Sequence, residues 1–325
     1  MSTVSNDAPE LAWLNGKIIS WDACVIHARS QAAFWGANVF EGVRAYWNPD
    51  HEQLYLYRLD DHLRRLRASM KCLNMPVTYD DAELRGAVLA LLRESNTRQD
   101  THIVFVTGFN FGTNFDSLGY TEDTLTHITA LPMPRSPRYE SGVSVAVSSW
   151  RRISDETSPP RIKTGANYHN SRLAQHEAVR NGHDTALFLN QRGTLAEAPG
   201  CCVAVVLGNE IVTPPGTSGV LEGITLDTMG RLASERLGLT FQRREIDRTE
   251  LYLADEAMLC GTLAELQPII RVDGVDIGTG KPGPILRELQ QLYDQEVRTG
   301  GQSTPVYPAT ETHVEDKPLT LEAGQ

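Results

Sequence analysis

The stretch Arg161-Ile162-Lys163-Thr164-Gly165-Ala166-Asn167-Tyr168 is the most informative part of the sequence. It follows a predicted strand (143–150) and a Ser-Pro-Pro turn, and a helical pattern (167–181) begins as it ends. A lysine that is held between rigid elements can lose its hydration, which lowers the pKa of its amine. Lys163 is therefore a candidate nucleophile toward a carbonyl cofactor, although most lysines are simply solvated charges.

A carboxylate between two apolar runs is the first partner that such a lysine needs. Glu197 lies in a loop between the predicted strands 185–189 and 203–207. A carboxylate in this setting is expected to be partly buried and to need a cationic or hydrogen-bonding partner. The protonated nitrogen of a pyridine ring would be such a partner, and the pair would keep the ring electron-accepting. The alternative is a glutamate at the edge of a loop that faces water.

Two further segments are typical of phosphate binding. Leu221-Glu222-Gly223-Ile224-Thr225 opens a predicted helix (225–237), whose first amides and dipole favour an anion. Gly261-Thr262 follows a short apolar strand (257–259) and offers a hydroxyl and backbone amides at a turn. Each segment alone is equally typical of an ordinary helix start or strand end. Together with the lysine and the carboxylate, they predict a site for pyridoxal phosphate.

These motifs, in this order, resemble those of the fold-type IV pyridoxal phosphate enzymes, and most of all the branched-chain aminotransferase group. The resemblance extends over most of the chain, from about residue 13 to about residue 292. The matching stretches are Val39-Phe40-Glu41-Gly42-Val43-Arg44, Lys163 to Tyr168 with Asn170-Ser171, Ala196-Glu197, Gly223-Ile224-Thr225-Leu226-Asp227, Leu251-Tyr252-Leu253-Ala254-Asp255-Glu256 and Gly261-Thr262-Leu263-Ala264-Glu265. The implied fold is of the α+β or α/β class. It has a small N-terminal α/β domain and a larger C-terminal domain with a β-barrel-like core.

The resemblance also implies a role for each site residue. Lys163 would bond to the cofactor and then move the proton between the substrate α-carbon and the cofactor. The phosphate of the cofactor would be bound by Arg65, Ile224, Thr225 and Thr262, with Gly223 beside them. Tyr168 would bind the phenolic oxygen, Glu197 the ring nitrogen and Leu221 the face of the ring. Substrate binding is implied for Trp35, Phe40, Arg44, His102, Leu263 and Ala264. Only the resemblance distinguishes Arg65 from its neighbours Arg64 and Arg67.

Three departures from the family pattern bear on the substrate. The predicted strand 102–107 begins His102-Ile103-Val104, where relatives that act on branched-chain amino acids usually carry Tyr-Ile-Arg. A carboxylate clamp built there would differ or be absent, which leaves His102 and Arg44 as the candidates. Cys201-Cys202 replaces a usual Glu-Asn pair, and Glu222 replaces a common proline. Neither of these two changes removes an essential group.

The leading interpretation is a transaminase that moves an amino group between a branched-chain or other hydrophobic amino acid and a 2-oxo acid. The same fold also allows an (R)-amine or D-amino acid donor, and it allows a lyase of the aminodeoxychorismate type. Thr225 and Thr262 favour the transaminase over the lyase. A cofactor-binding protein without catalysis is disfavoured, because both Lys163 and Glu197 are present.

Composition is that of a globular enzyme, and it argues against several other classes. Thirty basic against 41 acidic residues give a net charge of −11, which disfavours nucleic acid or an anionic membrane as a partner. The start of the sequence has no secretory signal pattern, and no apolar run is long enough to span a bilayer. Five cysteines without a CxxC motif indicate a reducing compartment, so we expect a cytoplasmic protein. Nine histidines without metal-ligand spacing predict no metal site.

The sequence divides into two unequal parts. Residues 1–133 are expected to form the small domain, 134–138 a proline-rich linker and 139–325 the large cofactor-binding domain. Asn15-Gly16 predicts a hairpin turn, and helices are predicted at 59–73, 79–95 and 284–296. The polar tail 299–325 is expected to be mobile. The resemblance also implies a homodimer, which the sequence alone does not establish.

Overall fold

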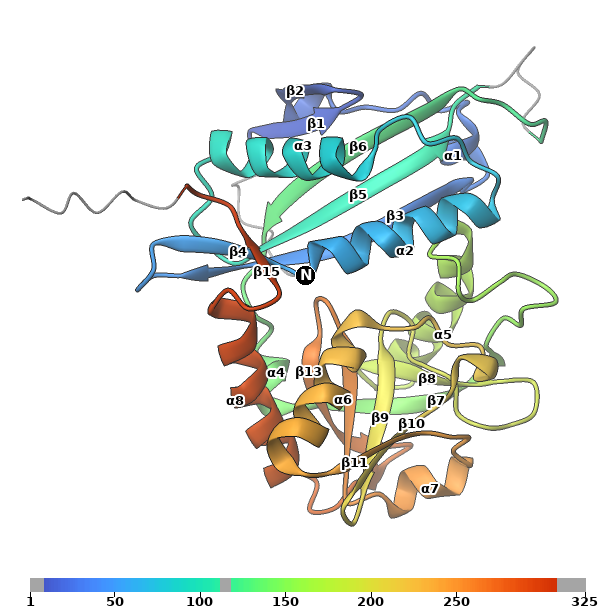
Figure 1. Cartoon of the computed structure of the whole chain (residues 1–325). Coiled ribbons are helices and arrows are strands. Elements are labelled where there is room, and N and C mark those ends of the chain that lie inside the picture. The colour runs from blue at the N-terminus through green and yellow to red at the C-terminus, as the bar shows by residue number, and fades with distance from the viewer. Residues whose placement is uncertain (1–8, 112–117, 309–325) are drawn as a thin grey trace, which may run out of the picture.

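The computed structural model describes residues 9–111 and 118–308 and consists of two halves, each built on one β-sheet (Figure 1). The upper half in Figure 1 has a seven-stranded sheet in the order β15-β4-β3-β5-β6-β1-β2. Its strands are β1 (Leu11–Leu14), β2 (Lys17–Ser20), β3 (Asn38–Asn48), β4 (Gln53–Tyr57), β5 (Thr101–Phe109), β6 (Thr124–Pro132) and β15 (Ser303–Pro305). Its helices are α1 (Gln31–Phe34), α2 (Leu59–Cys72) and α3 (Asp81–Glu94).

Local sequence explains these elements. The predicted hairpin is confirmed, because Asn15 and Gly16 both adopt positive φ (44° and 90°) between the paired strands β1 and β2. Helix α2 buries Leu59, Leu63 and Leu66 against the sheet at helical spacing. Helix α3 begins with a capping box that Asp80 and Glu83 form.

The lower half has an eight-stranded sheet in the order β11-β10-β9-β12-β13-β7-β8, with β14 beside β13. Its strands are β7 (Val143–Arg151), β8 (Thr185–Leu189), β9 (Cys202–Leu207), β10 (Glu210–Thr213), β11 (Thr240–Arg243), β12 (Glu256–Gly261), β13 (Glu265–Val272) and β14 (Val275–Asp276). Its helices are α4 (Arg138–Ser141), α5 (Tyr168–Arg180), α6 (Ile224–Leu237), α7 (Arg248–Leu253) and α8 (Pro284–Arg298). Within the described ranges, no helix is long and apolar enough to cross a membrane.

A short irregular segment curls this second sheet toward a barrel. Leu195 bridges Leu189 at the end of β8, and its amide donates to the carbonyl of Ile246, just beyond β11, at 2.8 Å. The segment therefore joins the two edge strands of the sheet. A core of aliphatic side chains fills the interior, including Val203, Val205 and Leu259. This is the barrel-like core that the family resemblance implies.

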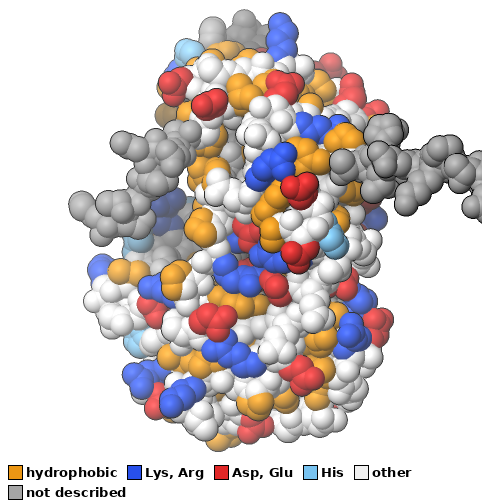
Figure 2. Space-filling view, turned by 90° about the vertical axis from the view of Figure 1, so that its left-hand side faces the viewer, with side chains coloured by type: hydrophobic (Ala, Val, Ile, Leu, Met, Phe, Trp, Pro, Cys, Tyr) orange, Lys and Arg blue, Asp and Glu red, His pale blue; other side chains and the backbone are white. Residues whose placement is uncertain are grey.

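Over residues 9–111 and 118–308, the chain passes between the two halves twice. The first passage lies between β6 and β7 and includes the predicted linker 134–138. The second follows α8, which packs against strands of both sheets. Acidic and basic side chains lie next to one another across the waist of the face that Figure 2 presents. The two halves are in contact through charged groups, such as the Arg58–Asp227 ion pair, and through apolar groups, because Tyr46 and Tyr57 pack in the core of the lower half.

The chain beyond α8 differs from the sequence prediction. The segment expected to be a mobile tail contains β15, which pairs with β4, and Val306, which has no exposed area and packs in the core of the upper half. The sequence did not predict this strand, because polar residues precede Val306 and only Val306 is strongly apolar. The prediction is therefore wrong for residues 303–306. The rest of the predicted tail, 309–325, lies outside the described residues.

Truncation after Gln302 should therefore destabilise the protein. It removes the β15–β4 pairing and the buried side chain of Val306, and burial of one such side chain contributes about 1.5–3 kcal/mol. We expect the melting temperature to fall by about 5 °C or more in a thermal unfolding scan. Truncation after Pro308, which keeps β15, is the matched control. An equal loss of stability in both truncations would contradict this account of β15.

Candidate active site

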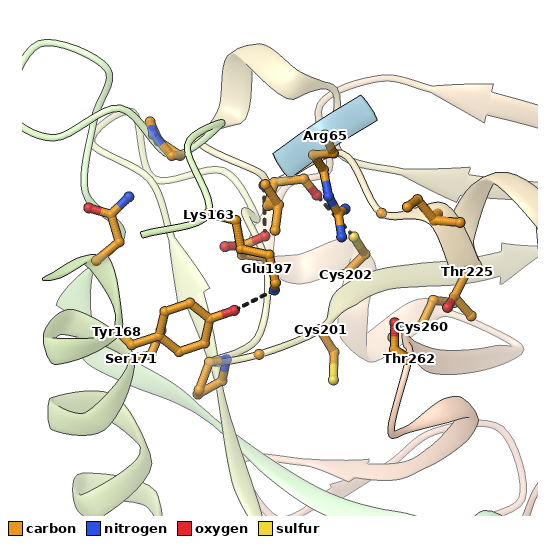
Figure 3. Close-up of a pocket in the computed structure, with 18 of the residues that line it drawn as sticks. Arg65, Lys163, Tyr168, Ser171, Glu197, Cys201, Cys202, Thr225, Cys260 and Thr262 are labelled. Carbon is orange, nitrogen blue, oxygen red and sulfur yellow. Dashed lines mark hydrogen bonds between the residues drawn. The ribbon is translucent and has the colours of Figure 1, made fainter. Parts of the chain in front are cut away.

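A hollow lies at the junction of the two halves, and it brings together residues that are far apart in sequence (Figure 3). Lys163 and every residue predicted to bind the cofactor line it: Arg65, Tyr168, Glu197, Leu221, Gly223, Ile224, Thr225 and Thr262. Tyr168 lies at one end of the hollow, and Thr225 and Thr262 lie at the other (Figure 3). The arrangement suits an elongated ligand with one anionic end.

The backbone around Lys163 is fixed by the first sheet. Its amide donates to the Ser69 hydroxyl at 3.2 Å, and its carbonyl accepts from the amide of Phe40 on β3 at 2.9 Å. The side chain extends into the hollow, where Nζ lies 2.8 Å from the Tyr168 hydroxyl and 4.8 Å from the centroid of the Phe40 ring. Tyr168 is the first residue of α5. The amine is thus held by a hydroxyl and by the face of an aromatic ring.

Glu197 lies on the segment that closes the barrel, and its carboxylate is almost completely buried. Oε1 pairs with Nη2 of Arg152 at 2.6 Å, and Oε2 accepts the Leu221 amide at 3.0 Å. Burial raises the pKa of Glu197, although Arg152 and the Leu221 amide oppose this shift. A protonated ring nitrogen would add a further favourable partner to this carboxylate.

Sequence reasoning did not identify Arg152. It stands directly after β7, beside the similar Arg151, and nothing in the local pattern distinguishes the two. In the structure Arg152 is buried and Arg151 is exposed. Only the three-dimensional path of the chain after β7 shows which arginine reaches Glu197.

Arg65 is held in place by a carboxylate that is itself completely buried. Nε and Nη2 of Arg65 donate to the two oxygens of Glu41 at 2.6 and 2.8 Å, and Nδ1 of His62 lies 2.8 Å from the same carboxylate. Burial alone would raise the pKa of Glu41, but hydrogen bonds and charge from Arg65 and His62 lower it to about 2. Nη1 of Arg65 donates to the carbonyl of Glu222 at 2.7 Å, across the junction.

The N-terminus of α6 faces the same end of the hollow. Gly223 is its N-cap, and within the described chain no side chain caps it. A Cβ at Gly223 would lie 2.6 Å from Sγ of Cys202, so a glycine is required here. The amides at the start of the helix, the Thr225 hydroxyl and the nearby Arg65 suit a phosphate group. The residues present therefore fit pyridoxal phosphate.

An ion pair outside the hollow holds the turn that contains Thr262. It connects β12 and β13 and also contains the predicted substrate residues Leu263 and Ala264. Glu265, which is buried and has a φ of 54°, ends the turn. Arg135 of the linker donates to both oxygens of Glu265, at 2.7 and 3.0 Å. The linker thus holds the turn at the edge of the hollow.

Other predicted substrate residues do not line the hollow. Arg44 is buried, donates to the carbonyl of Met133 at 3.0 Å and lies 3.7 Å from Asp100, so its charge is already engaged. His102 pairs with it in the β3–β5 ladder, and burial, with the charges of Arg44 and Lys163, lowers its pKa to about 4. Its imidazole is therefore neutral at pH 7. Trp35 is half exposed, at the end of α1.

Three cysteines line the hollow, which the sequence did not predict. Cys202 and Cys260 are cross-strand partners on β9 and β12, and Cys201 precedes them. Burial raises the pKa of Cys201 and of Cys202 to about 12. The thiols are therefore neutral and place no negative charge beside a phosphate. The Cys201-Cys202 pair, which departs from the family pattern, therefore lines the site.

A lysine, a buried carboxylate and a helix N-terminus around one hollow, on this two-sheet fold, define a pyridoxal phosphate enzyme of fold type IV. The family model "Amino-transferase class IV" matches residues 38–272. The chain belongs to this family of pyridoxal-phosphate-dependent aminotransferases.

Relatives are similar to almost the whole chain. The probable branched-chain-amino-acid aminotransferase of Aquifex aeolicus is 35% identical over 92% of this chain and 97% of its own length. The Escherichia coli K12 branched-chain-amino-acid aminotransferase is 34% identical over 86% of this chain and 91% of its own length. A crystal structure of the branched-chain amino acid aminotransferase from Thermobaculum terrenum, in its PLP form, has a TM-score of 0.86 and 41% identity. It covers 92% of this chain and 99% of its own.

Replacement of Glu41 by Gln should destabilise the protein in a pH-dependent way. The substitution leaves Arg65 buried without a charged partner, which typically costs about 3–5 kcal/mol. Because folding lowers the pKa of Glu41 to about 2, its contribution to stability is complete above pH 4.5 and is lost as the pH falls toward 2. In denaturant unfolding, the difference in the free energy of unfolding between wild type and Glu41→Gln should therefore decrease by about 1–2 kcal/mol from pH 6 to pH 3.

The exposed Glu94→Gln variant is the control and should keep the pH profile of the wild type. If the difference in the free energy of unfolding between wild type and Glu41→Gln stays constant over this pH range, the ionised Glu41 does not stabilise the fold through Arg65.

Proposed function

We propose that this aminotransferase moves an amino group between a hydrophobic, branched-chain-like L-amino acid and a 2-oxo acid. The observation that carries the proposal is the uncharged surface of the first sheet beside Lys163. Side chains of neighbouring strands that pair in register share one face, so Phe40, Gly42, Val104 and Val106 lie together there. All four are partly exposed. A hydrophobic side chain would find an apolar wall at this position.

The cationic or titratable side chains near this wall are not free to bind a carboxylate on the side chain of a substrate. Arg44 is engaged by Asp100, and His102 is neutral above about pH 5 because burial lowers its pKa to about 4. A Cβ at Gly42 would lie 2.8 Å from Nε2 of His102, so the glycine makes room for the imidazole. The wall therefore favours a side chain without charge. The names of the relatives over most of the chain support the same substrate class.

The residues of the hollow suggest how the reaction proceeds. Bound pyridoxal phosphate supplies an electron-accepting ring. Lys163 acts first as a nucleophile and then as the base that takes the proton from the α-carbon of the donor. The Tyr168 hydroxyl, at 2.8 Å, positions the Lys163 amine. Glu197, whose negative charge Arg152 stabilises, would pair with the ring nitrogen. Arg65, Thr225 and Thr262 would hold the phosphate.

A second candidate function uses an (R)-amine or a D-amino acid as the donor. It is favoured by the same wall, because Val104 and a neutral His102 stand where a carboxylate clamp would need a cation or a hydroxyl. An amine donor has no carboxylate and requires no clamp. The two candidates differ in the donor and share every group around the cofactor.

We also infer a homodimer in the cytoplasm. Large apolar side chains are exposed close together in the segment 25–35, among them Val25 (71%), Phe34 (54%) and Trp35 (50%). A monomer seldom leaves such a group uncovered, and a second copy of the chain would cover it. The five free cysteines support a reducing compartment.

The donor class can be read from the cofactor spectrum. The holoenzyme is mixed separately with L-leucine, D-alanine and an aryl (R)-amine while the cofactor absorbance is followed. We expect L-leucine to convert the cofactor to its amino form, because its side chain fits the wall of Phe40 and Val104. Conversion by the (R)-amine or D-alanine, with L-leucine inert, would move the enzyme to the second candidate.

Replacement of Lys163 by Ala tests the catalytic role. The variant should lose activity by several orders of magnitude, since it lacks both nucleophile and base. The exposed Lys71→Ala variant serves as a control that keeps activity. Turnover and cofactor absorbance that both survive Lys163→Ala would overturn the mechanism.

A further inference from the structure

A second hollow lies behind the pair formed by Arg152 and Glu197. Its walls are the loop 152–161, the turn 190–192 after β8 and the segment 216–219. It encloses about 740 Å³ of empty space, its open mouth included. Arg152 and Pro160 line both this hollow and the active site. A ligand in the second hollow would therefore lie one side chain away from Glu197.

The walls of this hollow carry polar groups without partners. Neither the Arg161 guanidinium nor the Asp155 carboxylate makes a hydrogen bond or an ion pair with any described residue, and both are exposed. Ser218 is 1% exposed, and within the described chain its hydroxyl also has no partner. The protein encloses this hydroxyl, so the charged groups of the wall that a ligand can reach are Arg161 and Asp155. By contrast, Arg192 already pairs with Glu245.

One ligand class complements these groups. A positive and a negative charge without partners suit a molecule that has a carboxylate and an ammonium group at once. Ile153 and Pro160 add apolar surface for a hydrophobic side chain. We propose that the second hollow binds a hydrophobic α-amino acid, with its carboxylate at Arg161 and its ammonium group at Asp155. The proposal does not depend on which donor the active site uses.

The bound amino acid would act on the active site through Arg152. Nε of Arg152 donates to the carbonyl of Gly219 at 3.2 Å, and Gly219 is part of the wall of the second hollow. Two residues later, the Leu221 amide donates to Glu197 at 3.0 Å. Both groups that hold the Glu197 carboxylate are thus connected to the segment 216–219. A ligand that contacts this segment would therefore change how firmly Glu197 is held.

Calorimetry on holoenzyme that has been reduced with borohydride tests the proposal, because this treatment stops turnover at the active site. L-Leucine is the probe, and its 2-oxo acid is the comparison. We expect Arg161→Met to weaken the binding of both about tenfold, since a hydrogen bond to a charge is lost. Asp155→Asn should weaken the binding of L-leucine but not of its 2-oxo acid, because the 2-oxo acid has no ammonium group. Both residues are exposed, so neither variant should impair folding.

Arg151→Met and Glu156→Gln are the matched controls, because these exposed neighbours do not line the hollow. They should bind L-leucine as the wild type does. The absorbance of the cofactor should shift at the same L-leucine concentration as the heat signal, because Glu197 is affected. Binding that Arg161→Met and Asp155→Asn leave unchanged, or no binding at all, would overturn the proposal. Heat without any spectral shift would overturn the coupling to Glu197.

Discussion

A carboxylate with no exposed area, Glu41, holds the guanidinium that joins the two halves of the molecule. Its bonds to Arg65 fix a positive charge at the end of the hollow where α6 begins. Arg65 in turn donates to the carbonyl of Glu222, at the turn that opens α6. An arginine left alone there would be a buried charge without compensation, which is strongly unfavourable. The helix N-terminus and the first sheet keep their relative positions because this pair is satisfied.

The two halves contribute different groups to the site that lies at this junction. The first sheet contributes Phe40, which packs beside Lys163, and the apolar surface around it. The second half contributes Glu197, Thr225 and Thr262, which line the hollow. Neither half contains a complete site. The site therefore depends on the buried ion pairs at the junction, of which Glu41–Arg65 is one and Arg135–Glu265 another.

Sequence predicted the local parts of this structure better than the contacts between them. Periodicity located most of the long helices and strands, and the Gly-Ile-Thr and Gly-Thr motifs predicted groups that do line one hollow. Arg152 was missed because an arginine after a strand carries no local signal, and Arg44 was offered as a clamp although Asp100 engages it. Partners of charged side chains are chosen by the fold, so a linear pattern does not contain them.

The pairing of β15 with β4 also has a consequence for biosynthesis. The strands that it completes are made early, but residues 303–306 leave the ribosome only after both sheets and α8 have been synthesised. While the chain is still growing, β4 is an edge strand with unpaired backbone groups, and exposed edges promote pairing with other chains. The nascent protein is therefore most vulnerable to misassembly at its first sheet, until its last strand is released.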